Sequence, residues 1–132
     1  MSAALITFDT YQPGTIMGSV TEAVDPAWLD AWCGLYPWDA PAHGEIPAAM
    51  YTALMMRAYL KVVSPRPPGN IHARQHTEFL SPAKLGESIT TEVRCISKEL
   101  RRERRYVDLE ARARGEDGRA LYVGRMSMIW AA

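Results

Sequence analysis

Asp39 and His43 can both exchange protons, and they stand four positions apart in the segment GLYPWDAPAHGEIP. This segment, residues 34–47, holds three prolines and two glycines, a composition that predicts a loop. The apolar stretch that follows predicts a buried helix, whose first N–H groups and dipole favour an anion or a carbonyl oxygen. His43 is therefore the leading catalytic candidate, although it could simply cap the helix. Asp39 is a weaker one, because Asp before Ala-Pro is also an ordinary turn residue.

A second chemical feature is the basic run Arg101-Arg102-Glu103-Arg104-Arg105. Guanidinium groups bind phosphate through paired N–H donors, so Arg101, Arg102 and Arg104 are candidate phosphate ligands. The alternative is a solvated turn between two strands, which is the common reason for such a run.

His72 and His76 are candidate metal ligands by residue type only. On a strand they lie roughly 13 Å apart, so they do not form a compact ligand set. We expect a solvent-facing or dimer-facing surface, with His76 a minor candidate for lining a site. Cys33 and Cys95 are far apart and lack zinc-ligand spacing, which argues against a zinc site and favours a reducing cytoplasm.

Length and charge narrow the class of protein. The 132 residues suit one domain, residues 1–132, and the 15 basic residues balance the 15 acidic ones. No net positive field is available to recruit nucleic acid or an anionic membrane. The N-terminus shows no basic region followed by an apolar run, and no window reaches the roughly 18 apolar residues of a membrane span. We therefore expect a soluble protein that is not exported.

The first half of the chain predicts strands and two helices. Residues 5–8 and 15–24 are rich in β-branched residues and predict a strand interrupted by Pro13-Gly14. Asp25-Pro26 predicts the start of a short helix. Residues 46–63 are apolar on nearly all sides, which indicates a long helix buried all round, and a segment rich in proline ends it.

The second half changes to alternating apolar and polar residues. Residues 70–79, 88–97 and 105–114 each predict a strand with one wet face, and residues 115–118 predict a hairpin turn. Residues 120–131 are apolar on both faces, which predicts a central strand. A helix without a polar face must be covered by a sheet, and four or five antiparallel strands suffice.

Short motifs along this half resemble a known family. They are Ala42-His43-Gly44 before the long helix, the segment FLSPAKLGE at residues 79–87, which is similar to the family pattern Phe-x-x-Pro-x-x-x-Gly-Asp, and Glu116-Asp117-Gly118. The chain resembles the MaoC-like dehydratase and (R)-specific enoyl-CoA hydratase group. This resemblance implies an α+β hot-dog fold, a long central helix wrapped by a five- or six-stranded antiparallel sheet. The cone-shaped α+β barrel is the alternative, but it normally opens with several amphipathic helices.

The resemblance also implies a site. Members of the family use an Asp and a His from an Asp-x-Asn-Pro-x-His motif to activate water, and backbone N–H groups near the helix start to polarise the thioester carbonyl. Asp39 and His43 are either a shortened version of that motif, or His43 belongs to a separate His-Gly pair and the catalytic pair is missing. Gly44, Ile46 and Tyr51 are the expected oxyanion and substrate-binding residues, with His76 beside them.

Three functions follow as expectations. The first is an acyl-thioester hydratase or dehydratase acting at a dimer interface, as a homodimer or with another hot-dog chain. The second is a non-catalytic hot-dog subunit that binds acyl-CoA or supports a catalytic partner, and the third is a hot-dog thioesterase. No cofactor is expected, because the substrate would be carried on coenzyme A or an acyl carrier protein, whose phosphates the arginine run would bind.

Overall fold

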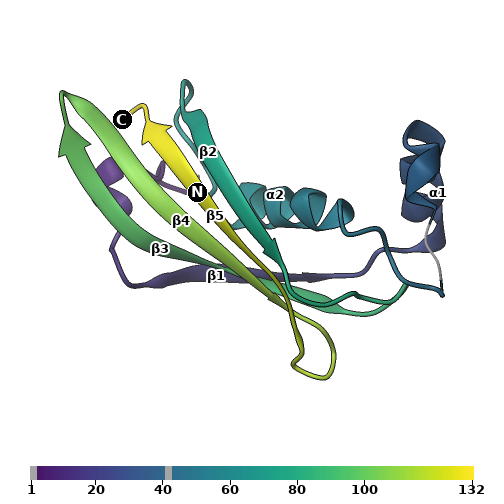
Figure 1. Ribbon diagram of the computed structural model, residues 1–132. Helices are drawn as coiled ribbons and strands as arrows, with labels where there is room; N and C mark the ends of the chain where they lie inside the picture. The colour runs from purple at the N-terminus through teal and green to yellow at the C-terminus, as the bar shows by residue number, and fades with distance from the viewer. Residues whose placement is uncertain (1–2, 41–42) are drawn as a thin grey trace.

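The computed structural model describes residues 3–40 and 43–132, and Figure 1 shows their arrangement. Five antiparallel strands form one sheet in the order β1-β3-β4-β5-β2. The alternating segments of the sequence supply the strands, whose bounds are β1 Ile16–Glu22, β2 Ile71–Phe79, β3 Ile89–Arg101, β4 Arg104–Arg114 and β5 Ala120–Trp130.

Two helices accompany the sheet. The long helix α2, Met50–Val62, lies along one face of the sheet and contacts β1, β3 and β5. The short helix α1, Pro26–Leu35, stands apart at the right of Figure 1, and its start is capped by the Asp25 side chain, as the Asp-Pro pair predicts. Single 3-10 turns occur at Phe8–Thr10 (η1) and Pro37–Asp39 (η2).

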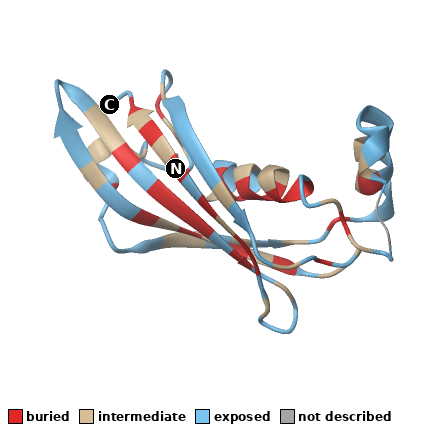
Figure 2. Ribbon diagram, viewed as in Figure 1, coloured by how far each residue is buried: buried red, intermediate tan, exposed pale blue. Residues whose placement is uncertain are grey.

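The core lies between α2 and the middle of the sheet, where Figure 2 shows the buried residues gathered. Alternate residues of β3 and β4 are fully buried, among them Val93, Leu109 and Ala111. β5 pairs with β4 on one side and β2 on the other, so the prediction that it is an interior strand is confirmed, although β4 is the middle one. Gly124 of β5 lets Met55 of α2 approach the backbone, since a Cβ there would collide with the Met55 sulfur.

The prediction for α2 was wrong in two respects. The helix begins at Met50 rather than at Ile46, because the Ile46 N–H donates to the Ala83 carbonyl oxygen at 2.9 Å and so pairs with a distant segment. The helix is also not buried all round: Leu60 is 46% exposed, and Arg57 and Lys61 are exposed as well. The sheet covers one face of α2 and leaves the opposite face open.

β2 also differs from the expectation of one wet face. It is an edge strand, and its residues are exposed on both faces apart from the half-buried Thr77. The alternation breaks where His72 pairs with Met128 and Arg74 with Ser127, which leaves Ala73 as an extra residue, a β-bulge.

Residues 5–8 do not form a strand, contrary to the prediction. The reciprocal hydrogen bonds of Thr7 and Thr10 stabilise η1 instead. The Ile6 N–H donates to the Pro65 carbonyl at 2.9 Å and the Phe8 N–H to the Ala132 carbonyl at 2.7 Å, so this segment crosses between the end of α2 and the C-terminus. The hairpin turn at residues 115–118 is confirmed.

Candidate functional site

A pocket of about 350 Å³ opens at the N-terminal end of α2, and we call it the α2 pocket. The approach to the helix forms one wall, and the end of β2 with the link that follows forms the other. The lining is mostly apolar and aromatic, with one carboxylate; its residues are Glu45, Ile46, Ala48, Tyr51, Phe79, Leu80, Ser81 and Pro82.

The start of α2 leaves backbone donors beside this pocket. Its N-cap residue is Ala49, and no side chain caps the helix. The Met50 and Tyr51 N–H groups donate to the Pro47 and Ala48 carbonyls, both at 3.0 Å. Among the hydrogen bonds of residues 3–40 and 43–132, none uses the N–H of Ala48 or Ala49. An uncapped helix start supplies free N–H donors to a partly negative oxygen.

Tyr51 forms the inner wall of the pocket. Its hydroxyl donates to the Ser81 carbonyl oxygen at 2.7 Å, and its ring packs against Tyr122 with 5.0 Å between centroids and stacks on Phe79 at 6.2 Å. Burial raises the Tyr51 pKa to about 12, so the phenol stays protonated at neutral pH. Tyr51 therefore presents a protonated hydroxyl that is already bonded to the Ser81 carbonyl.

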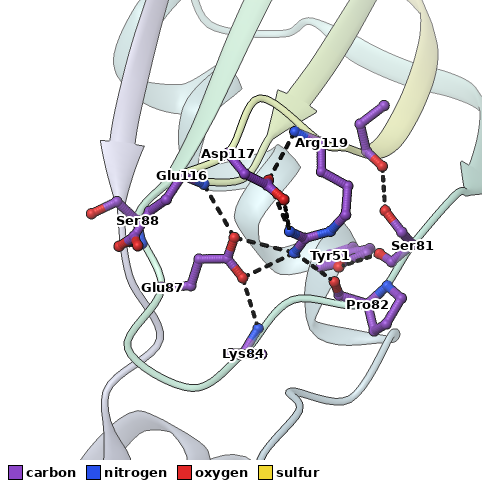
Figure 3. Close-up of polar contacts among 10 residues, drawn as sticks. Tyr51, Ser81, Pro82, Lys84, Glu87, Ser88, Glu116, Asp117 and Arg119 are labelled. Carbon is purple, nitrogen blue, oxygen red and sulfur yellow. Dashed lines mark hydrogen bonds and ion pairs between the residues drawn. The ribbon is translucent and has the colours of Figure 1, made fainter.

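The opposite wall is held by a group of hydrogen bonds that we call the Glu87–Arg119 network (Figure 3). Arg119 Nη2 donates to the Pro82 carbonyl at 2.9 Å and to both Glu87 carboxylate oxygens at 3.0 and 3.1 Å. The Lys84 and Glu116 N–H groups donate to the same carboxylate. Burial alone would raise the Glu87 pKa, but these donors outweigh it and hold the pKa below its ordinary value. The turn between β4 and β5 thus fixes the pocket wall.

The structure does not bring Asp39 and His43 into the pocket. The Asp39 carboxylate accepts a hydrogen bond from Trp32 Nε1 of α1 at 2.9 Å, so its partner is the helix just before it in the chain. His43 is exposed, with a positive φ of 58°, and it precedes the pocket residue Glu45 by two positions. Pro41 and Ala42, which join the two candidates, lie outside the described residues.

Of the four predicted substrate-binding residues, two line the α2 pocket and two do not. Tyr51 and Ile46 line the pocket, but the Ile46 N–H is used by Ala83 and does not serve as an oxyanion donor. Gly44 is exposed with φ 71°, and its carbonyl accepts the Leu85 N–H at 2.9 Å. His76 pairs with Arg125 on the face of the sheet away from α2, so it does not belong to this pocket.

No family model matches the chain, and no curated protein matches it either. Solved structures do match across nearly all of it. The R-hydratase PhaJ1 from Pseudomonas aeruginosa aligns with a TM-score of 0.76 at 16% identity, over 96% of this chain and 86% of that one. The MaoC-like dehydratase from Rhodospirillum rubrum gives 0.77 at 14% identity, over 96% and 98%. A hot-dog-like protein from Thermanaerovibrio acidaminovorans gives 0.69 at 16% identity, over 92% and 84%.

The chain has the hot-dog fold of the MaoC-like dehydratases and (R)-hydratases. At these identities the likeness concerns the fold alone. Thioesterases of similar fold also match, so the hot-dog fold by itself does not choose between hydration and thioester hydrolysis.

The predicted phosphate ligands lie far from the α2 pocket of this hot-dog domain. Arg101 and Arg104 pair at the facing ends of β3 and β4, and Arg102 lies in the turn between them. Figure 1 shows this turn at the opposite end of the sheet from the β4–β5 turn. The Arg101 guanidinium stacks over the Tyr106 ring at 4.4 Å from its centroid. The alternative interpretation of this run as a turn between strands is the one that the geometry supports.

Sequence reasoning missed Glu45, Ala48 and Arg119. Glu45 was visible as the last acidic residue before the apolar stretch, but the helix was expected to begin one residue later and to bury that region. Arg119 gave no local signal, because its partners Pro82 and Glu87 stand more than thirty positions away.

Within the described part of the chain, no group of three or more His, Cys, Asp or Glu side chains is placed to hold a metal ion. No helix there combines the length and hydropathy that a bilayer crossing requires.

Proposed function

We propose that the α2 pocket binds an acyl thioester and that the protein hydrates or dehydrates it. The observation that carries this proposal is the pocket at an uncapped helix start, with Glu45 and Ala48 among its lining residues. The hot-dog fold shared with R-hydratases and MaoC-like dehydratases supports it.

The chemistry assigns a role to each group. Hydration of an enoyl thioester adds the oxygen of water to C3 and a proton to C2, and negative charge develops on the thioester oxygen in between. The Ala48 and Ala49 N–H groups would stabilise that oxygen, as preorganised donors do in oxyanion holes. The Glu45 carboxylate would accept the proton of the attacking water and return a proton to C2. His43, two residues earlier, is the second candidate for this base.

We further propose that the protein acts as a dimer, with itself or with another hot-dog chain. The free edge of β2 offers unpaired backbone groups, and Ile71 and Phe79 along it are 55% and 54% exposed. A partner strand would pair with this edge. Because Phe79 also lines the α2 pocket, the site would then border the subunit interface. A substrate carried on coenzyme A, together with two free cysteines, fits a cytoplasmic location.

A second candidate is a non-catalytic subunit that binds the thioester. The position of Asp39 favours this candidate, because its carboxylate accepts a hydrogen bond from Trp32 and does not line the α2 pocket. Thioester hydrolysis is a third candidate, since Glu45 could equally activate water for attack on the carbonyl carbon.

One assay separates these candidates. Crotonyl-CoA would be incubated with the protein while the loss of the enoyl absorbance and the release of free thiol are followed together. We expect absorbance loss without thiol release, and a fall in kcat of roughly 10²–10⁴-fold in Glu45→Gln if Glu45 is the base. His43→Ala tests the second base, and Glu103→Gln at the distant turn is the matched control.

Thiol release would identify a thioesterase. Saturable binding of crotonyl-CoA without turnover, with activity appearing only after a catalytic hot-dog partner is added, would identify the non-catalytic subunit. Absence of both binding and turnover would overturn the proposal.

A further inference from the structure

The face of the sheet away from α2 carries a regular array of charges. Cross-strand partners on neighbouring strands point to the same face. Two adjacent rows of such partners, mostly charged, cross β4, β5 and β2. One row is Arg112, Val123 and Glu78, and the other is Glu110, Arg125 and His76.

Glu110 organises the two arginines of this array. Its side chain is 4% exposed, and its oxygens accept from Arg112 Nε at 2.6 Å and Arg125 Nε at 3.3 Å. Burial alone would raise the Glu110 pKa, but the two guanidinium groups outweigh it and hold the pKa below its ordinary value. Glu110 is therefore ionised at neutral pH and anchors both arginines through their ε nitrogens.

The η nitrogens of both arginines remain available. The Arg112 and Arg125 side chains are 58% and 67% exposed, and no hydrogen bond among the described residues uses their η nitrogens. Guanidinium groups that are already oriented bind phosphate oxygens through paired N–H donors at a low entropic cost.

These arginines line a hollow next to the α2 pocket. The hollow measures about 410 Å³, and its other lining residues are His76, Glu78, Leu80 and Val123. Leu80 also lines the α2 pocket, so the two spaces share one side chain just beyond the end of β2. A ligand with its reactive end in one space and an anionic group on a flexible arm would reach the other.

We propose that Arg112 and Arg125 form a phosphate subsite for the arm of the thioester whose acyl group occupies the α2 pocket. This inference rests on the proposed function. In place of Arg101, Arg102 and Arg104 at the far end of the sheet, it assigns phosphate binding to two arginines beside the pocket. Glu78 lines the same hollow and would repel a phosphate, so removing its charge should strengthen binding.

The experiment compares crotonyl-CoA with the crotonyl thioester of N-acetylcysteamine, which has the same reactive end and no phosphate. In Arg112→Gln and Arg125→Gln, we expect KM for crotonyl-CoA to rise about 10-fold, the usual loss for a hydrogen bond to a charged group. KM for the phosphate-free thioester and kcat for both should stay unchanged. Glu78→Gln should lower KM for crotonyl-CoA alone, and Arg101→Ala should change neither value.

Arg125→Lys keeps a charge beside Glu110 and serves if a glutamine variant fails to fold; it should raise KM for crotonyl-CoA only. Crotonyl phosphopantetheine distinguishes the two phosphate sources: an effect that persists identifies the arm shared with carrier proteins, and one that disappears identifies the nucleotide phosphates.

Arginine variants that change both thioesters equally, or neither, would overturn this inference while the proposed function stands. Failure of the unaltered protein to bind or convert any of the thioesters would instead overturn the proposed function, and the subsite with it.

Discussion

The two ends of the sheet differ in how their turns are held. At the pocket end, the β4–β5 turn is tied by Arg119 to Pro82 and Glu87 of another segment. At the far end, the β3–β4 turn carries Arg101 and Arg102, both exposed, and among the described residues its backbone pairs within its own hairpin. We therefore expect one arginine paired with the largely covered Glu87 side chain to stabilise this structure more than a run of arginines in solvent.

The reason is the cost of desolvation. An exposed guanidinium keeps its water and gains little from a neighbour. A carboxylate that is largely removed from water, such as Glu87 with a 9% exposed side chain, depends on every donor that faces it. The four predictions below test this contrast, beginning with the largest expected effect.

Arg119→Ala should lower the free energy of unfolding more than any other change below, because it leaves the Glu87 carboxylate and the Pro82 carbonyl short of a donor. Arg101→Ala, the matched change at the far end, should cost no more than about 0.5–1 kcal/mol, since it removes an exposed stacking contact. Urea unfolding measures both. Similar losses at the two ends would contradict the contrast.

Glu87→Gln should lower the free energy of unfolding by about 1–2 kcal/mol at pH 7, because charge-assisted hydrogen bonds become neutral ones. The Glu87 pKa is lower in the folded protein than its ordinary 4.5, so its contribution is present above that value. It is lost as the pH falls below 4.5 through the folded pKa. The stability difference between the two proteins should therefore shrink in acid, and a difference that is constant with pH would refute the assignment.

Tyr51→Phe should cost about 1 kcal/mol, because the Ser81 carbonyl loses its buried donor. Tyr106→Phe on β4 is the control at the far end and should change the melting temperature little. If Tyr51→Phe leaves the melting temperature unchanged while raising KM for the thioester, the hydrogen bond shapes the pocket without stabilising the fold.

The smallest effects are expected in the turns themselves. Arg102 and Glu103 both adopt positive φ, 51° and 65°, which costs energy for any residue with a Cβ. Glu103→Gly should therefore stabilise the protein by about 0.5 kcal/mol, net of the entropy that glycine loses on folding. Gly118→Ala, at φ 79° in the pocket-end turn, should destabilise it by about 1 kcal/mol. Thermal unfolding of both variants gives the signs, and equal signs would refute the assignment.

Local patterns explain which parts of the fold could be foreseen. The alternation in residues 88–97 and 105–114 predicted strands β3 and β4, and Asp25-Pro26 predicted the start of α1, because periodicity and capping depend on neighbouring residues. The start of α2 could not be foreseen in the same way. Ile46 is apolar and helix-compatible, yet its N–H pairs with Ala83, a partner that no local window contains.

The candidate site shows the same division. Tyr51 was foreseen as a substrate-binding residue from the family resemblance, and as the second residue of α2 it does line the pocket. Asp39 was expected to act on substrate, and its hydrogen bond to Trp32 became visible only when α1 and η2 were placed beside each other. The arginine run was conspicuous in the sequence, whereas Arg112 lay on the wet face of a predicted strand and Arg125 lay in a stretch interpreted as apolar on both faces. Their common contact with Glu110 appears only in the structure.

The sequence by itself determined the kinds of elements, their order and the faces of β3 and β4 that are apolar, since these follow from the spacing of residues along the chain. Only the tertiary structure decided which backbone donors at the start of α2 are left unpaired and which charged side chains meet. Those outcomes depend on contacts between segments remote in sequence, and the free energy of such a contact is set by the water that both partners lose.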